Sequence, residues 1–287
     1  DTMIALPGLT LATGRPEIAR QILVSYAAYI DAGLLPNHLP DGHTALAYNS
    51  VDAALWFLAA WQAYFAASQD EGTLAQYFPV LDGIIAAYSE GTYFGIGMDP
   101  RDGLVHAGEI GVQLTWMDAK VGEWVVTPRQ GKPVEINALW YNALCAMAEF
   151  AERLDRPAAA YREAARLTKS GFDRYVRADG QGLKDVLDGP DGDDLARRPN
   201  QIFAVSLPHS PLSLARQREV VAICGTRLLT SYGLRSLAPI HPAYWPRYRG
   251  GLHDRDAAYH QGTVWAWLLG HYAMAEYRVT GKRSLAL

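Results

Sequence analysis

Cysteine is nearly missing from this sequence, which holds only Cys145 and Cys224 among its 287 residues. Each of the two lies in an apolar stretch with helical spacing, where a cysteine usually packs as a small hydrophobic side chain. We therefore expect two free thiols in a fold that does not depend on disulfide bonds. Nothing in this cysteine usage calls for an oxidising compartment.

An excess of charge and long apolar runs are lacking as well. The formal net charge is −4, and the 26 Lys and Arg residues are scattered rather than gathered into a stripe, so we expect no nucleic-acid partner. No apolar stretch reaches the roughly 20 residues that cross a bilayer, and no basic segment leads into an apolar one at the N-terminus. We therefore expect no membrane partner and a cytoplasmic location. Because the sequence opens on Asp1 rather than on an initiator methionine, we also expect it to be a fragment.

The motifs that hold cofactors and metals are absent from the sequence. There is no Gly-x-Gly-x-x-Gly segment after a strand, no Walker loop and no His-Glu-x-x-His, and no Gly-x-Ser-x-Gly elbow presents a nucleophilic serine. His253 and His260 lie near Asp254 and Asp256, but without the regular helical spacing of metal ligands. We expect no cofactor and no metal.

Aromatic rings that carry a polar group are abundant, with 8 Trp and 16 Tyr against 7 Phe. Such rings suit a wet cleft, and the apolar C–H faces of sugars pack on flat aromatic platforms flanked by carboxylates and amides. The alternative is that these rings fill a large helical core. With 49% apolar residues and no shift in composition along the chain, we expect a single domain over residues 1–287.

Apolar residues recur at helical spacing along most of the chain. Thr13 and either Asn49 or Ser50 are expected as N-caps, and the last helix, apolar on nearly all sides, is expected on the inner ring of a toroid of helical hairpins. Long loops over 34–48, 91–132, 184–199 and 231–261 are expected to carry function. The expected helices cover residues 3–9, 13–32, 50–65, 73–89, 134–154, 158–177, 201–206, 214–230 and 262–280.

One carboxylate stands out because Asp118 lies between Trp116 and Trp124 in the second of these loops. A carboxyl group pressed against apolar rings has its charged form desolvated and its pKa raised, which is the condition for a general acid near neutral pH. Asp118 is therefore the candidate acid. The alternative is that Asp118 caps a helical turn or pairs with Lys120.

Several ordered motifs resemble the C-terminal glucosidase domain of glycogen debranching enzymes, and the resemblance covers essentially the whole chain. The motifs are Asp1–Leu9, Leu114–Lys120, Thr127–Arg129, Gly131–Asn142 and Tyr259–Trp265. The resemblance implies an all-α (α/α)6 barrel with amylo-α-1,6-glucosidase activity, which acts on glycogen or another branched α-glucan with inversion. Glucoamylases and trehalases share this architecture.

The resemblance also implies roles for individual residues. Asp118 matches the general acid, and Asp1 matches an aspartate that grips hydroxyls of the terminal glucose, although the Gly-Arg that precedes it in the family is absent here. Further substrate-binding residues are expected at Asn49, Asp52, Trp116, Glu123, Trp124, Glu135, Asn137, Trp140, His260 and Gln261.

Structural roles are the alternative for several of these residues. Asn49 and Asp52 lie where a helix is expected to begin, an acid at Glu135 suits the first turn of a helix, and Trp140 suits a core. The polar cluster that ends in His260 and Gln261 favours a site.

An inverting mechanism needs a second, ionised carboxylate about 6.5 to 9.5 Å from the acid. The resemblance places this base at a glutamate beyond Leu287, and about nine helices are expected where the barrel needs twelve, so we expect a domain truncated at both ends that hydrolyses poorly alone. Internal alternatives for the base are Glu123, Asp254 and Asp256. Other functions left open are a trehalase-like or glucoamylase-like glycosidase and a non-catalytic glucan-binding barrel.

Overall fold

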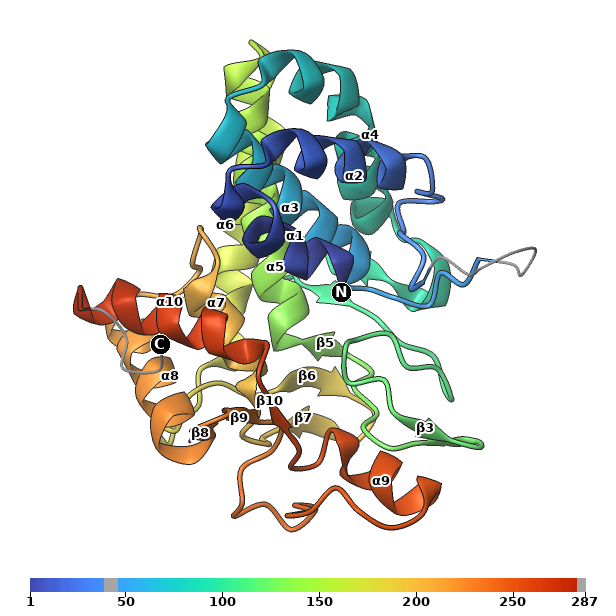
Figure 1. Cartoon of the computed structure of the whole chain (residues 1–287), viewed down its shortest axis with the longest axis vertical. Coiled ribbons are helices and arrows are strands. Elements are labelled where there is room, and N and C mark those ends of the chain that lie inside the picture. Colours follow the sequence, from blue (N-terminus) through green and yellow to red (C-terminus); the bar gives the residue numbers. More distant parts are fainter. Residues whose placement is uncertain (39–45, 283–287) are drawn as a thin grey trace.

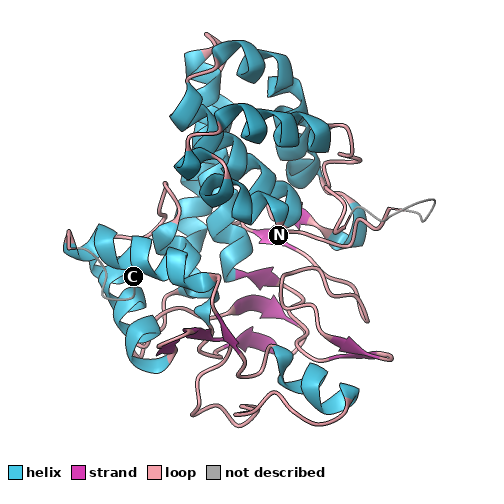
Figure 2. Cartoon of the chain, in the orientation of Figure 1, coloured by secondary structure: helices cyan, strands magenta, loops and turns pink. Residues whose placement is uncertain are grey.

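Helices dominate the computed structural model, which describes residues 1–38 and 46–282. Figures 1 and 2 show α1 to α6 gathered at one end of the molecule, with short strands and α9 at the other and α7, α8 and α10 to one side. Part of the expected functional loop 34–48, residues 39–45, lies outside the described residues. The α-helices are α1 (Thr2–Leu9), α2 (Pro16–Ala27), α3 (Ala53–Ser68), α4 (Glu71–Glu90), α5 (Val134–Arg153), α6 (Ala159–Phe172), α7 (Phe203–Ser206), α8 (Leu214–Arg227), α9 (Leu252–Tyr259) and α10 (Leu268–Thr280).

Helices α3 and α5 form the centre of the helical end. Helix α3 packs against α1, α2 and α5, and α5 packs in addition against α4, α6 and α7. Both helices are apolar around most of their circumference, and Trp61 of α3 and Trp140 of α5 are fully buried. This is the pattern expected of helices enclosed by other helices, and it confirms the prediction of a helix-rich fold.

The first turns of α2 and α3 show which of the expected capping residues the structure uses. Thr13 does not cap α2, because its hydroxyl donates to the carbonyl oxygens of Leu9 and Thr10 within the preceding turn; Pro16 occupies the first turn instead, where its missing N–H is not needed. At α3, the Ser50 hydroxyl accepts from the backbone N–H of Ala53 at 3.1 Å. The helix nevertheless begins at Ala53 with Asp52 at the N-cap position, so the prediction of Asn49 or Ser50 as the N-cap is wrong, although Ser50 supplies a hydrogen bond to the first turn.

The largest departure from the sequence-based expectation concerns residues 262–267, which were expected to begin an inner helix. They instead run through strand β10 (Val264–Trp265), which pairs with β9 (Gly233–Arg235), and the helix begins only at Leu268. Gly262 adopts φ +150°, and a Cβ there would lie 2.2 Å from the carbonyl oxygen of Trp245. The helical prediction is wrong here because β-branched and aromatic residues fit a strand equally well once a distant partner is present.

Short antiparallel strands and one further helix, α9, organise the segments expected to be loops. β1 pairs with β2 and β3 pairs with β4, while β6 lies between β5 and β7 in one three-stranded sheet and β9 lies between β8 and β10 in another. Because β5 begins at the end of the second expected loop and β6 lies within the third, their pairing brings residues near 132 and near 186 together. The remaining strands are β1 (Gly97–Met98), β2 (Val105–His106), β3 (Lys120–Val121), β4 (Trp124–Val125), β5 (Lys132–Pro133), β6 (Val186–Gly189), β7 (Gly192–Asp194) and β8 (Leu229–Thr230).

Candidate active site

A cavity of about 860 Å³ lies between the start of α1, the start of α3, the loop that precedes β3 and the segment from α9 to α10. These four parts of the chain are far apart in sequence. Six of the residues that the sequence predicts for the site line this cavity, namely Asp1, Asn49, Asp52, Trp116, Asp118 and His260. The structure therefore brings half of the predicted site together.

Trp116 is the centre of an aromatic group in this cavity. Its ring makes edge-to-face contacts with His260, Trp265 and Trp267, at centroid distances of 5.3, 5.7 and 5.2 Å. Trp116 keeps part of its surface exposed, and Trp56 also lines the cavity. Sequence analysis had placed Trp265 and Trp267 in an apolar helix, and it missed them as cavity residues because their exposure depends on the turn before α10.

Asp118 opens into the cavity two residues after Trp116. It forms no ion pair within residues 1–38 and 46–282, and the Lys120 ammonium donates instead to the carbonyl oxygen of Gly111 at 3.1 Å. Desolvation by the cavity walls raises the pKa of the Asp118 carboxyl, and the negative charge of Asp52 raises it further. These are the electrostatic conditions that keep a carboxylic acid protonated at higher pH.

Asp52 is the second acidic residue that faces this space. The Ser50 hydroxyl donates to Asp52 Oδ1 at 2.6 Å and accepts from the backbone N–H of Ala53. Asp52 occupies the N-cap position of α3, but its side chain makes no capping hydrogen bond. Burial raises the pKa of Asp52, and the hydrogen bond from Ser50 partly offsets the increase.

His260 lies at the base of the cavity and is fully buried. Neither ring nitrogen has a hydrogen-bond partner among the described residues. Burial lowers the pKa of His260 to about 3, and the positive charges of Arg198 and Arg129 act in the same direction. The imidazole is therefore neutral at ordinary pH and offers one donor and one acceptor to a bound molecule.

Three predicted site residues on α5 lie away from the cavity, which corrects their assignment. Glu135 and Asn137 are at most 2% exposed and Trp140 is fully buried. The Asn137 amide pairs with both backbone groups of Val105, at 2.6 and 3.0 Å, and Trp140 Nε1 donates to the carbonyl oxygen of Gly103 at 3.2 Å. Asn137 and Trp140 thus bind residues 103–105 to α5. Their contacts support a structural role for both side chains.

Three other predicted site residues also lie outside the lining of the cavity. The Gln261 side chain accepts from Arg198 Nη2 at 2.9 Å. Glu123 is exposed in the β3–β4 hairpin, and the neighbouring Trp124 stacks on His253 with a centroid distance of 5.4 Å. Glu123 and Trp124 lie near the acid in sequence but not in the cavity, because they belong to the β3–β4 hairpin, which does not line it.

The internal candidates for the base are also absent from the lining of the cavity. Glu123, Asp254 and Asp256 do not contribute to it, and its described carboxylates are Asp1, Asp52 and Asp118.

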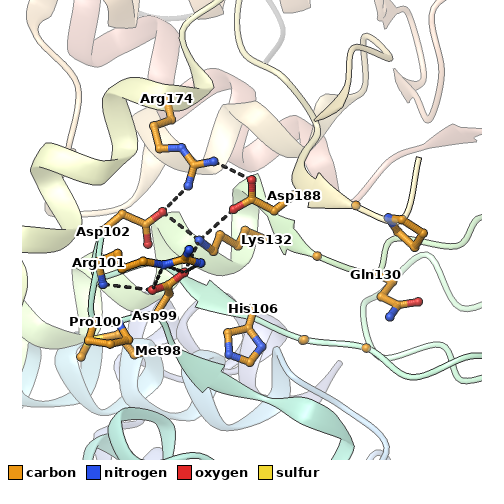
Figure 3. Close-up of a pocket in the computed structure, with 15 residues that line it drawn as sticks. Met98, Asp99, Pro100, Arg101, Asp102, His106, Gln130, Lys132, Arg174 and Asp188 are labelled. Carbon is orange, nitrogen blue, oxygen red and sulfur yellow. Dashed lines mark hydrogen bonds and ion pairs between the residues drawn. The ribbon is translucent and has the colours of Figure 1, made fainter. Parts of the chain in front are cut away.

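A second cavity, of about 880 Å³, lies beside the β5–β6 strands and is shown in Figure 3. At its centre, the Lys132 ammonium lies 2.9, 2.8 and 2.9 Å from carboxylate oxygens of Asp99, Asp102 and Asp188. Arg174 bridges Asp102 and Asp188. The charges of this cavity neutralise one another and its lining holds no Trp or Tyr, so the aromatic cavity is the better candidate for binding a sugar.

Metal-binding clusters and membrane-spanning helices are both missing from the described residues. No group of three or more His, Cys, Asp or Glu is placed to hold a metal ion. No helix in the described part of the chain combines the length and apolar character of a membrane span.

Comparison with known proteins assigns this architecture. The family model described as amylo-alpha-1,6-glucosidase matches residues 1–287. The chain belongs to the amylo-α-1,6-glucosidase family. This member is 26% identical to the glycogen debranching enzyme of Saccharomyces cerevisiae over 377 aligned positions, which cover 99% of the chain and 24% of the yeast protein. The chain thus spans about a quarter of the length of this curated relative.

Solved structures share the fold of this family member. It superposes on the GH63 mannosylglycerate hydrolase of Thermus thermophilus with a TM-score of 0.71 at 14% identity, covering 98% of this chain and 80% of that chain. A rhamnosidase from Klebsiella oxytoca gives a TM-score of 0.51 at 15% identity, with coverage of 74% and 38%. The predicted (α/α)6 fold and the predicted family are confirmed.

Proposed function

We propose that the chain hydrolyses the α-1,6-linked glucose of branch points in glycogen or a related α-glucan, with inversion and with Asp118 as the general acid. The observation that carries this proposal is the Asp118 carboxyl, which opens into the aromatic cavity without an ion-pair partner in the described chain and has a raised pKa. Family membership supports the substrate.

The cavity residues supply complementary interactions to a glucose unit. The protonated Asp118 donates its proton to the glycosidic oxygen as the bond to the anomeric carbon breaks. Trp116 presents part of its ring to the C–H face of the sugar, and the unpartnered nitrogens of His260 serve hydroxyl groups. Asp1 and Asn49 lie on the same lining and complete the set of hydroxyl ligands.

Asp52 acts in this proposal through its charge and its contacts to the sugar rather than as the base. The charge of the ionised Asp52 carboxylate raises the pKa of the neighbouring Asp118, which favours the protonated acid. The base is proposed to be the glutamate that the family resemblance places downstream of Tyr259–Trp265, outside the residues described.

Product analysis of the purified protein tests the proposal. We expect the protein, with its proposed base present, to release glucose from a branched limit dextrin, first as the β-anomer, which proton NMR distinguishes from the α-anomer during the first turnovers. Trehalose, a glucosylglycerate and linear maltooligosaccharides serve as the comparison panel. Faster turnover of one of these, or first release of the α-anomer, would contradict the proposal, and dextrin binding without hydrolysis would indicate a non-catalytic barrel.

The pH profile should respond to the charge of Asp52. Activity requires protonated Asp118, so kcat/KM falls as the pH rises through the pKa of this group. Because the Asp52 carboxylate raises that pKa, the variant Asp52→Asn should move the alkaline limb to lower pH. The measurement is the midpoint of this limb on limit dextrin, whatever the loss of overall rate. Glu109→Gln, an exposed carboxylate of the same loop, is the control, and an unmoved midpoint in Asp52→Asn would refute the coupling.

A further inference from the structure

A buried polar cluster lies directly behind the cavity wall that carries the proposed acid. It contains Arg129, Glu135, Asp185, Arg198 and Asn200, none of which is more than 8% exposed. Asp185 is its centre: its carboxylate accepts from Arg129 Nε at 2.7 Å and from Asn200 Nδ2 at 2.8 Å, and it lies 3.6 Å from Arg198 Nε. Two positive and two negative charges balance within it, as the burial of charge requires.

Each of the three residues that precede the proposed acid is held by this cluster. Thr115 Oγ1 accepts from Arg129 Nη1 at 3.4 Å, and Trp116 Nε1 donates to Asn200 Oδ1 at 2.8 Å. The sulfur of Met117 lies 3.6 Å from Asn200 Nδ2. The backbone that aims the acid is therefore anchored by three consecutive side chains, and Asn200 contacts two of them.

The opposite wall of the cavity is held by the same cluster. Arg198 Nη1 donates to the carbonyl oxygen of His260 at 2.7 Å and to that of Ser236 at 3.1 Å. Since Arg198 also pairs with Asp185, the segments that carry Trp116 and His260 are connected through one ionic centre.

Few side chains could replace Asn200, because its two neighbours need opposite hydrogen-bonding partners. The indole N–H of Trp116 can only donate, so its partner must accept, while the carboxylate of Asp185 needs a donor. An asparagine amide satisfies both at once. An aspartate would place a second carboxylate against Asp185, and an apolar residue would serve neither neighbour.

We propose that Asn200 is a positioning residue for the general acid: it holds the indole of Trp116 and thereby sets the direction in which Asp118 enters the cavity. This inference rests on the proposed function, since it concerns the aim of the acid. Asn200 itself lines neither cavity, so it acts through Trp116 and not by touching the sugar.

Two substrates that differ in their need for a general acid can distinguish a misplaced Asp118 from a general loss of folded structure. A glucan leaving group must be protonated as it departs, whereas the fluoride of α-glucosyl fluoride leaves with little assistance. We expect Asn200→Leu to lower kcat on limit dextrin on the order of 10-fold to 100-fold, as misplacement of a catalytic group by about 1 Å does. KM should change little, and kcat on α-glucosyl fluoride should fall at most about 3-fold.

The matched control is Asn142→Leu, which replaces another fully enclosed asparagine. Asn142 pairs with the Gln62 side chain at 2.8 Å and with the backbone N–H of His209 at 3.1 Å, and it does not line the aromatic cavity. This variant loses a similar set of buried hydrogen bonds, so we expect the ratio of the two substrate rates to stay at its original value. An equal loss on both substrates in Asn200→Leu, or the same change of ratio in Asn142→Leu, would overturn the proposal.

Two further measurements tie the effect to the indole. In a Trp116→Phe background, Asn200→Leu should not change the substrate ratio again, because the hydrogen bond is already gone. Independently of activity, the Nε1–H of Trp116 should exchange with solvent faster in Asn200→Leu than in the parent protein, as followed by nitrogen-edited NMR. Unchanged exchange would refute the role of Asn200. A parent protein that hydrolyses neither substrate would refute the proposed function, and the exchange measurement would still decide whether Asn200 holds Trp116.

Discussion

Asp118→Asn should abolish nearly all hydrolysis of limit dextrin while leaving the fold intact. Asparagine has the size of aspartate but cannot donate the acid proton, and general acid catalysis contributes about 10²-fold to 10⁴-fold to a rate. We expect a loss of this size in kcat with little change in KM, because the substitution leaves the aromatic lining in place. The measurement is glucose release under saturating dextrin, with the melting temperature recorded in parallel.

The control for this substitution is Glu109→Gln, which changes an exposed carboxylate of the same loop that does not line the cavity. Its activity should match that of the parent protein. On α-glucosyl fluoride, Asp118→Asn should lose far less activity than on dextrin, since fluoride needs little protonation to leave. Retention of more than about a tenth of the dextrin activity would show that another group supplies the proton.

Arg129→Met should cause the largest loss of stability among the substitutions considered. Arg129 pairs with Glu135 and Asp185, and all three side chains are at most 2% exposed. Burial alone would lower the pKa of Arg129, but the two carboxylates raise it above its ordinary value, so the guanidinium stays charged. Removing it leaves buried carboxylates without their main partner, which costs about 3 to 5 kcal/mol of unfolding free energy.

Thermal and urea unfolding measure this loss, which corresponds to a decrease in melting temperature on the order of 10 °C for a domain of this size. Burial raises the pKa of Glu135 and the charge of Arg129 opposes this increase, so without Arg129 the folded-state pKa of Glu135 should lie further above its unfolded value. A carboxyl group with a raised folded-state pKa binds its proton more tightly in the folded protein than in the unfolded chain. The stability that this binding contributes is present at low pH and is lost as the pH rises through the folded-state pKa. The deficit of Arg129→Met should therefore shrink as the pH is lowered.

Two further variants serve as a rescue and a control for the stability loss of Arg129→Met. Arg129→Met combined with Glu135→Gln should regain part of the stability, because one unpaired carboxylate is removed. Arg101→Met breaks an ion pair with Asp99 in which the arginine side chain is 85% exposed, and it should cost at most about 1 kcal/mol. A loss for Arg129→Met no larger than that for Arg101→Met would contradict the structural role assigned to the cluster.

Local patterns in the sequence predicted most of the helices and singled out Asp118 as a candidate acid. The apolar spacing of residues 53–68 and 134–153 is repeated at every turn, so each helix and its burial can be recognised from neighbouring residues alone. Asp118 was also recognisable, since the aromatic residue that shapes its surroundings, Trp116, lies only two positions away.

Tertiary structure decided which polar residues reach the cavity. Asn137 resembles a site residue in the sequence, yet its amide is used by Val105, 32 positions away. Asn200 carries no local signal, yet it holds Trp116 from a distance of 84 positions.

The sequence by itself thus predicted a helix-rich member of the amylo-α-1,6-glucosidase family with Asp118 as its candidate acid. Only the tertiary structure decided that Asp1, Asp52 and His260 share the cavity with it and that residues 262–267 leave the helix. The physical reason is the separation along the chain of the residues that determine each property. Helix formation and burial follow from side chains within a few turns of one another, whereas the accessibility and partners of a polar group depend on segments that the chain brings together only on folding.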